Sequence, residues 1–277
     1  MAHNSIIKKI FLLCAGLILI RHFCLTQTDG FSLSKIHSDL SFHEEWKTSG
    51  DLGTICDQPF HYLGHGAQVF AFVSEDQTAI LKFYRHHRTK HPLQCLAFVF
   101  PRISRTLEKR KLKRVKDFSS YKIAYDHLPE ETGLLYVHLN KTAHLKKKVE
   151  LYDKIGVRLF VDLDKVEFLL QKKANLVYST LEEWIERGDF QSAEKGLTNL
   201  VQLLRVRHDK GIFDKDPDLK TNFGFIGDQA IQFDIGRFKQ ESSQNDSDSL
   251  IRITDRLCVW LDEKAPQLAE HLRREVR

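Results

Sequence analysis

Hydrophobic and polar positions alternate along the chain from residue 60 onward. The run Phe60 to Ser74 alternates on both sides of a glycine turn, and Ala79 to Tyr84 follows after a second polar turn. Alternation with a period of two is typical of strands with one buried face. The pattern predicts three antiparallel strands in succession, and later apolar segments predict more strands of a mostly antiparallel sheet, at 134–139, 149–152, 158–162 and 166–170.

Helical spacing appears in other segments. Residues 101–128 repeat apolar positions every three or four residues, which predicts one long helix. A capping-box pattern at Ser179–Glu182 predicts the start of a second helix. Residues 191–209 predict a third helix, with Gly211 as its stop, and residues 251–261 predict a single closing helix. The order is an α+β chain with a strand-rich half, one long helix, and then a mostly helical half.

The amino-terminal segment differs from the rest. Lys8 and Lys9 precede an apolar run from Ile10 to Ile20 that stops at Arg21. The run is short for a membrane span but normal for a signal sequence or a signal anchor. No small-x-small cleavage site follows closely, which favours an uncleaved membrane anchor over residues 1–25, while a buried helix or an unused extension is the alternative. The lysines would stay in the cytoplasm, and the side of the membrane on which the domain lies is left open.

Composition and charge limit the possibilities. The chain has 277 residues, 42% hydrophobic and 29% charged, so it can bury one sizeable core or two small lobes after a polar connector at 26–57. Its net charge of +5 is uneven, because residues 102–116 hold eight Lys or Arg and one Glu. This basic run suits phosphates, an anionic membrane or nucleic acid, or it is a solvated helix face. Without interleaved aromatics or a recognised motif, no specific nucleic-acid binding is expected.

Cysteine and histidine spacing gives no metal site. The five cysteines lack the paired spacing of zinc ligands, and they read as ordinary thiols. His86, His87 and His91 cluster beside Lys90, but no cysteine or carboxylate stands at ligand spacing. The sequence therefore gives no indication of a metal site at these residues.

Residues 208–236 hold the most informative chemistry. Asp216, Asn222 and Asp234 surround a tight turn at spacings that a strand–turn–strand could bring together on one or two Mg²⁺ ions. Upstream, Gly64 and Gly66 lie in the first strand turn, where backbone N–H groups can approach a phosphate closely. Together with a lysine on the third strand, these groups favour phosphoryl transfer.

These segments together resemble the protein-kinase-like superfamily over about residues 58–262, in its divergent bacterial branch that includes small-molecule kinases. Leu63-Gly-His-Gly66 is similar to the glycine-rich loop, and Ala79-Ile-Leu-Lys82 to the strand with the nucleotide-holding lysine. Gly211-Ile-Phe-Asp-Lys-Asp216 is similar to Gly-Ile-Val-His-Arg-Asp, and Asn222 with Asp234-Ile-Gly236 to the catalytic-loop Asn and the Asp-Phe-Gly motif. The five elements keep the order of the family.

The resemblance implies a bilobal fold, with an N-terminal lobe at 58–174 and a compact C-terminal lobe at 175–277. It also implies an ATP-dependent phosphotransferase acting on an unknown hydroxyl acceptor. Lys82 would contact the α- and β-phosphates of ATP and pair with Glu108, for which Asp117 is a rival on the same helix. Asp216 would orient the acceptor hydroxyl, while Asn222 and Asp234 would hold Mg²⁺. Residues 171–174 would form the adenine-contacting hinge.

The chain departs from the family pattern at several positions. Asp214 stands where a histidine is usual, Val69 replaces the third glycine, and Ile235 replaces phenylalanine. Asn222 follows Asp216 by one residue more than usual, so Asp218 offers a competing register for the catalytic acid. Only 41 residues follow Gly236, and none resembles an Ala-Pro-Glu segment. This ending favours a small-molecule or lipid acceptor, or a second hypothesis, a membrane-tethered pseudokinase or binding module without phosphotransfer.

Overall fold

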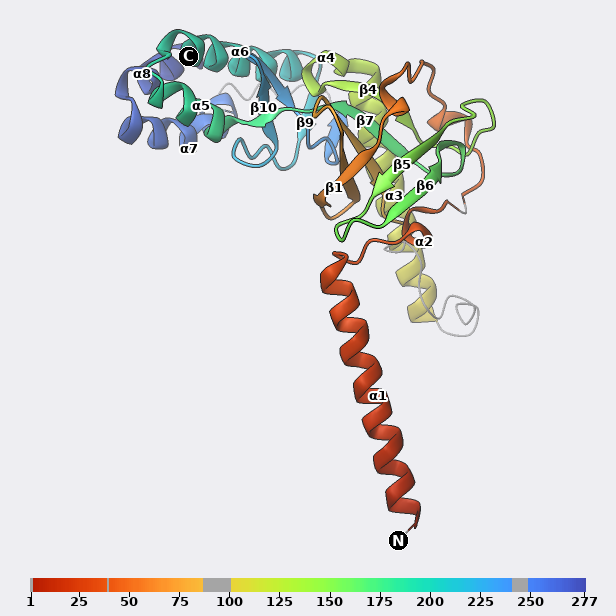
Figure 1. Ribbon diagram of the computed structural model, residues 1–277. Coiled ribbons are helices and arrows are strands. Elements are labelled where there is room, and N and C mark those ends of the chain that lie inside the picture. Colours follow the sequence, from red (N-terminus) through yellow and green to blue (C-terminus); the bar gives the residue numbers. More distant parts are fainter. Residues whose placement is uncertain (1, 39, 87–100, 241–248) are drawn as a thin grey trace.

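The structure is a computed structural model that describes residues 2–38, 40–86, 101–240 and 249–277, with side chains from residue 11 onward. His87, Lys90, His91 and Cys95 lie outside the described residues. The chain is α+β, with a curled sheet at one end of the folded part and helices gathered at the other (Figure 1).

The main sheet has seven strands in the order β4-β7-β3-β2-β1-β5-β6. They are β1 (Phe60–His65), β2 (Val69–Ser74), β3 (Ala79–Tyr84), β4 (Leu134–His138), β5 (Lys148–Tyr152), β6 (Arg158–Asp162) and β7 (Phe168–Lys172). All neighbours are antiparallel except β1 and β5, which are parallel. The sheet is therefore mixed and mostly antiparallel, and the parallel pair β1–β5 is the exception to the expected pattern. Strand β7 also begins two residues later than expected, because a 3₁₀ turn at Leu163–Lys165 precedes it.

The long helix α3 (Pro101–His127) is followed by the short α4 (Pro129–Thr132). The later helices are α5 (Val177–Glu186), α6 (Phe190–Asp209), α7 (Ser249–Lys264) and α8 (Pro266–Glu275). Two expectations were wrong here. The N-cap of α5 is Leu176, so Ser179 lies inside the helix and caps nothing. The closing segment forms two helices, because Pro266 cannot continue α7 and begins α8 instead.

Two small sheets lie between the main sheet and the helices. Strands β8 (Asn175–Leu176), β10 (Phe223–Ile226) and β11 (Gln229–Gln232) form one, in the order β11-β10-β8. Strands β9 (Ile212–Asp214) and β12 (Phe238–Gln240) form the other. The residues between these short strands form the turns that carry the acids of the 208–236 segment.

Helix α1 (Ala2–Gln27) extends away from the rest of the molecule (Figure 1). Its large apolar side chains are exposed, with Phe11 at 72%, Leu17 at 58% and Phe23 at 62%. Across the described part of the chain, no helix combines the length and the apolar character needed to cross a membrane.

The segment expected to be a polar connector, 26–57, packs on the folded part. It forms α2 (Leu33–Ile36) and two 3₁₀ turns, Glu44–Trp46 and Ile55–Asp57. Phe31 is 5% exposed and lies edge-on to Phe70 and Phe72, with ring centroids 5.1 and 5.0 Å apart. Such aromatic contacts add to the burial of apolar area, so this segment is part of the sheet core.

Three apolar clusters form the interior. The first is formed by buried side chains of the main sheet and of the segment before it. The second lies among α5, α6, α7 and α8 with β10. The third lies between α3, β4 and residues 212–238. The third cluster fixes α3 against the turns of the 208–236 segment. The bilobal kinase-like description of this α+β fold stays a prediction.

Candidate functional site

Lys82 lies in the middle of β3, and its side chain extends toward Phe233, the residue that follows β11. Its Nζ donates a hydrogen bond to the backbone carbonyl of Phe233 at 2.8 Å and lies 5.5 Å from the centre of that ring. Desolvation lowers the pKa of Lys82 to about 8, and the negative charge of Asp234 opposes this shift. The lysine is thus bound to the residue that directly precedes Asp234.

Asn222 ties the acidic turn to the same place. Its backbone carbonyl accepts hydrogen bonds from the N–H groups of Phe233 at 3.0 Å and Asp234 at 3.3 Å. Its side-chain Nδ2 donates to the carbonyl of Asp216 at 2.7 Å. Lys82, Asn222, Asp234 and Asp216 are therefore joined by a continuous series of contacts, although Lys82 lies 134 to 152 positions before the others in the sequence.

The two rival acids of the turn differ in what they do locally. The carboxylate of Asp218 accepts from the backbone N–H of Lys220 at 3.0 Å and from Thr221 Oγ1 at 2.9 Å, so it stabilises its own turn. The side chain of Asp216 is 51% exposed, and its Oδ2 lies 3.0 Å from Arg237 Nη1. Asp216 is the acid whose carboxylate is held by a side chain from outside the turn.

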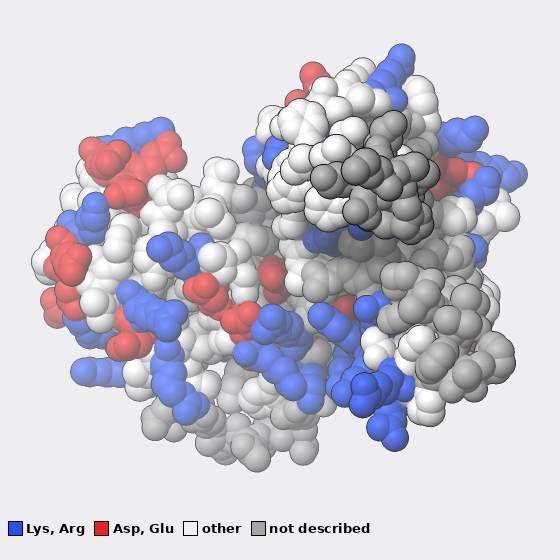
Figure 2. All heavy atoms as spheres, turned by 90° about the horizontal axis from the view of Figure 1, so that it is seen from below, with Lys and Arg blue, Asp and Glu red and all other residues white. Residues whose placement is uncertain are grey.

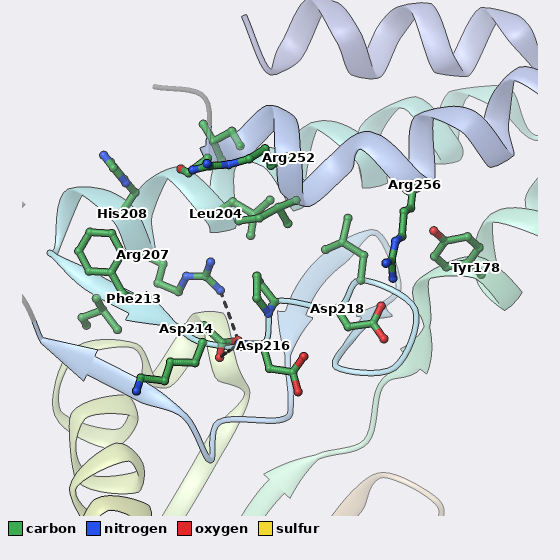
Figure 3. A pocket seen from close by; sticks show the side chains of 17 residues that line it. Tyr178, Leu204, Arg207, His208, Phe213, Asp214, Asp216, Asp218, Arg252 and Arg256 are labelled. Atoms are coloured by element: carbon green, nitrogen blue, oxygen red, sulfur yellow. Dashed lines mark hydrogen bonds and ion pairs between the residues drawn. The ribbon is translucent and has the colours of Figure 1, made fainter. Parts of the chain in front are cut away.

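Asp214 holds the turn through hydrogen bonds to its carboxylate. Its Oδ1 accepts from the backbone N–H of Asp216 at 2.9 Å, and its Oδ2 accepts from Gln232 Nε2. The guanidinium of Arg207, 6% exposed, lies 4.0 Å from that carboxylate and donates to Gln232 Oε1. Figure 3 shows Arg207 reaching Asp214 beside Asp216. Asp214, which stands where the kinase-like pattern has a histidine, thus provides a buried carboxylate that holds the backbone N–H of Asp216.

A cavity of about 480 Å³ opens on this side of the turn, between it and α7 (Figure 3). Arg252 and Arg256 of α7 line it together with His208 and the three acids of the turn. Asp216 therefore has access to open space beside cationic side chains.

The carboxylates of α3 are placed differently from each other. Glu108 is exposed, whereas Asp117, nine residues later on the helix, is 4% exposed. A separation of nine residues is about 13 Å along a helix. Asp117 accepts from Tyr84 Oη at 3.1 Å and from Gln68 Nε2 at 2.8 Å. Burial raises its pKa to about 6. The structure brings Asp117 near the site and leaves Glu108 in solvent.

Gln68 was not anticipated as part of the site. It lies between β1 and β2, just after Gly66, and Nε2 also donates to the carbonyl of Gly236 at 3.2 Å. Its Oε1 accepts from Tyr121 Oη of α3 at 3.0 Å. One side chain of the glycine turn thus joins α3 to the segment after Asp234. No pattern in the sequence marks Gln68; its position in the glycine turn was the one available signal.

A second cavity, of about 700 Å³, lies between the sheet and α5. It is lined by Lys82, Leu63 and Ala71 from the sheet and by Phe233 and Thr221 from the turns. Gln171 also lines it, and its Oε1 is buried without a hydrogen-bond partner among the described residues, while Nε2 donates to the carbonyl of Thr132 at 2.8 Å. A buried acceptor without a partner, on a residue that lines a cavity, is a candidate contact for a ligand that donates a hydrogen bond.

The glycine turn and the histidine cluster complete the sites expected from the sequence. A side chain at Gly64 or Gly66 would meet no atom within 4 Å, so the space beside the turn is open. His86 is buried against Glu167, with 2.5 Å between Nε2 and Oε2. Within the described residues, no three His, Cys, Asp or Glu side chains are grouped to hold a metal ion.

Comparison with known proteins gives limited results. No family model matches the chain, and no curated protein matches it. Among solved structures, a 2.2 Å crystal structure of WbdD is similar at 15% identity and a TM-score of 0.39, over 76% of this chain and 43% of that one. A structure described as the bifunctional kinase-methyltransferase WbdD is similar at 15% identity and a TM-score of 0.41, over 78% of this chain and 46% of that one. The chain spans less than half the length of these structures.

Proposed function

We propose that the protein is an ATP-dependent phosphotransferase of the kinase-like type that moves the γ-phosphate to a hydroxyl acceptor. The observation that carries the proposal is the series of contacts that joins Lys82, which lines the 700 Å³ cavity, to Asn222, Asp234 and Asp216. Asp216 lines the neighbouring 480 Å³ cavity. A cation, an amide and two carboxylates joined in one series of contacts are the groups that phosphoryl transfer requires.

The cavity suits a nucleotide. Its volume lies in the range of small-molecule sites, roughly 300 to 1,000 Å³. Apolar side chains such as Leu63 and Ala71 would contact a base, and the unpaired Gln171 Oε1 would accept from an exocyclic amino group. Lys82, which also lines the cavity, would meet the phosphates as a cation, since its pKa of about 8 leaves most of it charged at neutral pH.

Asn222 and Asp234 fit Mg²⁺, which takes oxygen ligands and is commonly bound by one or two protein groups together with substrate phosphates and waters. Asn222 Oδ1 already accepts from Thr221 Oγ1 at 3.0 Å, and Asp234 Oδ1 from the N–H of Gly236 at 3.2 Å, so both are oriented. A bound ion there would neutralise charge on the phosphates.

Asp216 would orient the acceptor. The acceptor oxygen forms a new bond to the γ-phosphorus, the bond from that phosphorus to the bridging oxygen breaks, and ADP leaves. The hydroxyl proton passes to the Asp216 carboxylate and then to water. Asp214 acts by positioning, because it holds the Asp216 backbone.

The test uses the full chain. Mg·ATP should raise the Tm of the wild type and of Asp216→Ala, and not that of Lys82→Met, because only the last change removes a phosphate contact. ADP release should fall at least about a hundredfold in Asp216→Ala, and much less in the matched control Asp218→Ala. Equal ADP release from wild type and Asp216→Ala would reject the assignment of Asp216. Failure of millimolar Mg·ATP to shift the wild-type Tm would reject the function.

The second candidate is a membrane-tethered binding module. The exposed apolar side chains of α1, which lie on several sides of the helix, favour it. The full chain should then float with phosphatidylcholine vesicles on a density gradient, and a chain lacking residues 1–27 should not. If both chains stay at the bottom of the gradient, the tether is refuted.

A further inference from the structure

The cations near Asp216 are not spread evenly around it. A cavity of about 640 Å³ lies between α3 and residues 236–240, and Ala67 and Gln68 also line it. Five cationic side chains line it: Lys113, Lys116, Lys215, Arg237 and Lys239. Asp117 is the one carboxylate of the lining, and it is already bonded to Gln68 and Tyr84.

The basic run of α3 supplies one wall. Arg110, Lys113 and Lys116 are three residues apart, so they share a face of the helix. Lys113 lines both the 640 Å³ cavity and a smaller one of about 380 Å³ that also contains Arg85 and Arg110. The two cavities share Ala67, Gln68 and Asp117 as well. Part of the run therefore borders a hollow and is not only a solvated helix face.

This basic hollow reaches the acceptor-orienting acid through one side chain. Arg237 lines the cavity, and its Nη1 lies 3.0 Å from Asp216 Oδ2. Lys215, adjacent to Asp216 in the chain, lines this cavity and also the one in Figure 3. A molecule bound among the cations would lie beside Asp216.

The charge of the lining determines which ligands are favoured. Like charges around one cavity repel, and an anion that enters relieves the repulsion while gaining charge-assisted hydrogen bonds. On the face of the molecule seen in Figure 2, Lys and Arg side chains gather at the centre and lower right, and most Asp and Glu side chains lie to the left. Such an uneven field attracts anions to one region.

We propose that this hollow, which we call the basic acceptor pocket, binds the phosphate of an acceptor that carries both a phosphate and a free hydroxyl. The inference rests on the proposed phosphotransferase function for its use, but the pocket binds the anion without nucleotide. A volume of about 640 Å³ accommodates a small molecule or a headgroup. Phe238 is the one aromatic residue of the lining and is only 3% exposed, so no ring is available for stacking with bases, which favours such an acceptor over a nucleic-acid strand.

The test measures binding of inorganic pyrophosphate to the full chain by calorimetry, with no nucleotide present. Lys113→Ala/Lys116→Ala should weaken binding about tenfold, because two charge-assisted contacts are lost. The matched control is Lys109→Ala/Lys111→Ala, which removes the same charge from exposed positions of the same helix that do not line the pocket. Binding by the control and by Lys82→Met should remain within about twofold of wild type.

Vesicles distinguish the source of the phosphate. Binding to phosphatidylcholine vesicles that contain phosphatidic acid, competed by pyrophosphate and weakened only by Lys113→Ala/Lys116→Ala, supports a lipid headgroup. Pyrophosphate binding without binding of these vesicles supports a free phosphorylated acceptor. Vesicle binding by α1 is controlled with vesicles of phosphatidylcholine alone.

Three results would overturn the inference. The first is no pyrophosphate binding at millimolar concentration. The second is binding lost in Lys82→Met and kept in Lys113→Ala/Lys116→Ala, which places the anion in the nucleotide cavity. The third is a single-stranded oligonucleotide that binds more tightly than pyrophosphate and is weakened equally by both lysine pairs, which indicates a general basic surface. None of these binding experiments contains ATP, so their outcome does not depend on whether Mg·ATP raises the Tm.

Discussion

Gln68 joins the glycine turn to Gly236, and substitution of that glycine tests the contact directly. A Cβ added at Gly236 would lie 2.0 Å from Gln68 Oε1 and 2.8 Å from its Cδ and Nε2. These atoms belong to the end of a flexible side chain, so Gly236→Ala should displace Gln68 and leave the backbone in place.

The magnitude follows from the bonds that Gln68 would lose. It donates to Asp117 at 2.8 Å and to the Gly236 carbonyl at 3.2 Å, and it accepts from Tyr121 at 3.0 Å. A net hydrogen bond is worth about 0.5 to 1.5 kcal/mol, and one to a charged group about 1.5 to 3. Since Gln68 is partly exposed, water replaces some of these bonds, and we expect a loss of about 2 kcal/mol in the free energy of unfolding.

The assay is a double-mutant cycle by urea unfolding, followed by tryptophan fluorescence. Gly236→Ala should lower the free energy of unfolding by about 2 kcal/mol in the wild type but by only a few tenths in Gln68→Ala, where no side chain remains to be displaced. Gln68→Ala by itself serves as the control for loss of the bonds. If Gly236→Ala is equally destabilising in both backgrounds, Gln68 is not what occupies the space beside Gly236.

Further predictions concern the buried charges and the cavity lining. Arg207→Met should lower the free energy of unfolding by about 3 kcal/mol, because Asp214 is left buried without its cation; a loss below about 0.5 kcal/mol in urea unfolding would contradict this. The folded-state pKa of Asp117, about 6, lies above its ordinary value of 3.8, so at this carboxyl the folded state binds more protons between these values, and its contribution to stability should fall by about 2 to 3 kcal/mol as pH rises from about 4 to about 6. Asp117→Asn should lose that pH dependence, and an unchanged slope would show that another group causes it. Gln171→Met should weaken Mg·ATP binding about tenfold in calorimetry, since it removes the unpaired acceptor of the cavity; unchanged affinity would exclude Gln171 from base contact.

Local patterns in the sequence were sufficient for most elements. The first three strands and the long helix lie within a residue or two of the expected bounds, because alternation and helical spacing reflect which faces are buried. The capping box at Ser179 failed because packing placed the helix start at Val177. The parallel β1–β5 pairing also had no local signal, since a strand's neighbour depends on the path of the chain between them.

The sequence by itself also determined the types of group at the candidate site, Lys82, Asp216, Asn222 and Asp234, through their order along the chain. Only the tertiary structure decided how the rival acids are placed, and which acid of each pair acts stays a prediction. Asp117 and Glu108 share one helix, but the helix packs so that Asp117 is buried and Glu108 is exposed. Asp218 bonds within its own turn, which leaves Asp216 for Arg237.

The contacts that organise the site join residues far apart in the sequence. Gln68 and Asp117 are 49 residues apart, and Gln68 and Gly236 are 168 apart. Such pairs meet only after the sheet, α3 and the 208–236 segment have packed on one another. Short-range patterns record which face of an element is buried, but the partner across an interface is set by packing, and that is why Gln68 and Arg207 could be recognised only in the fold.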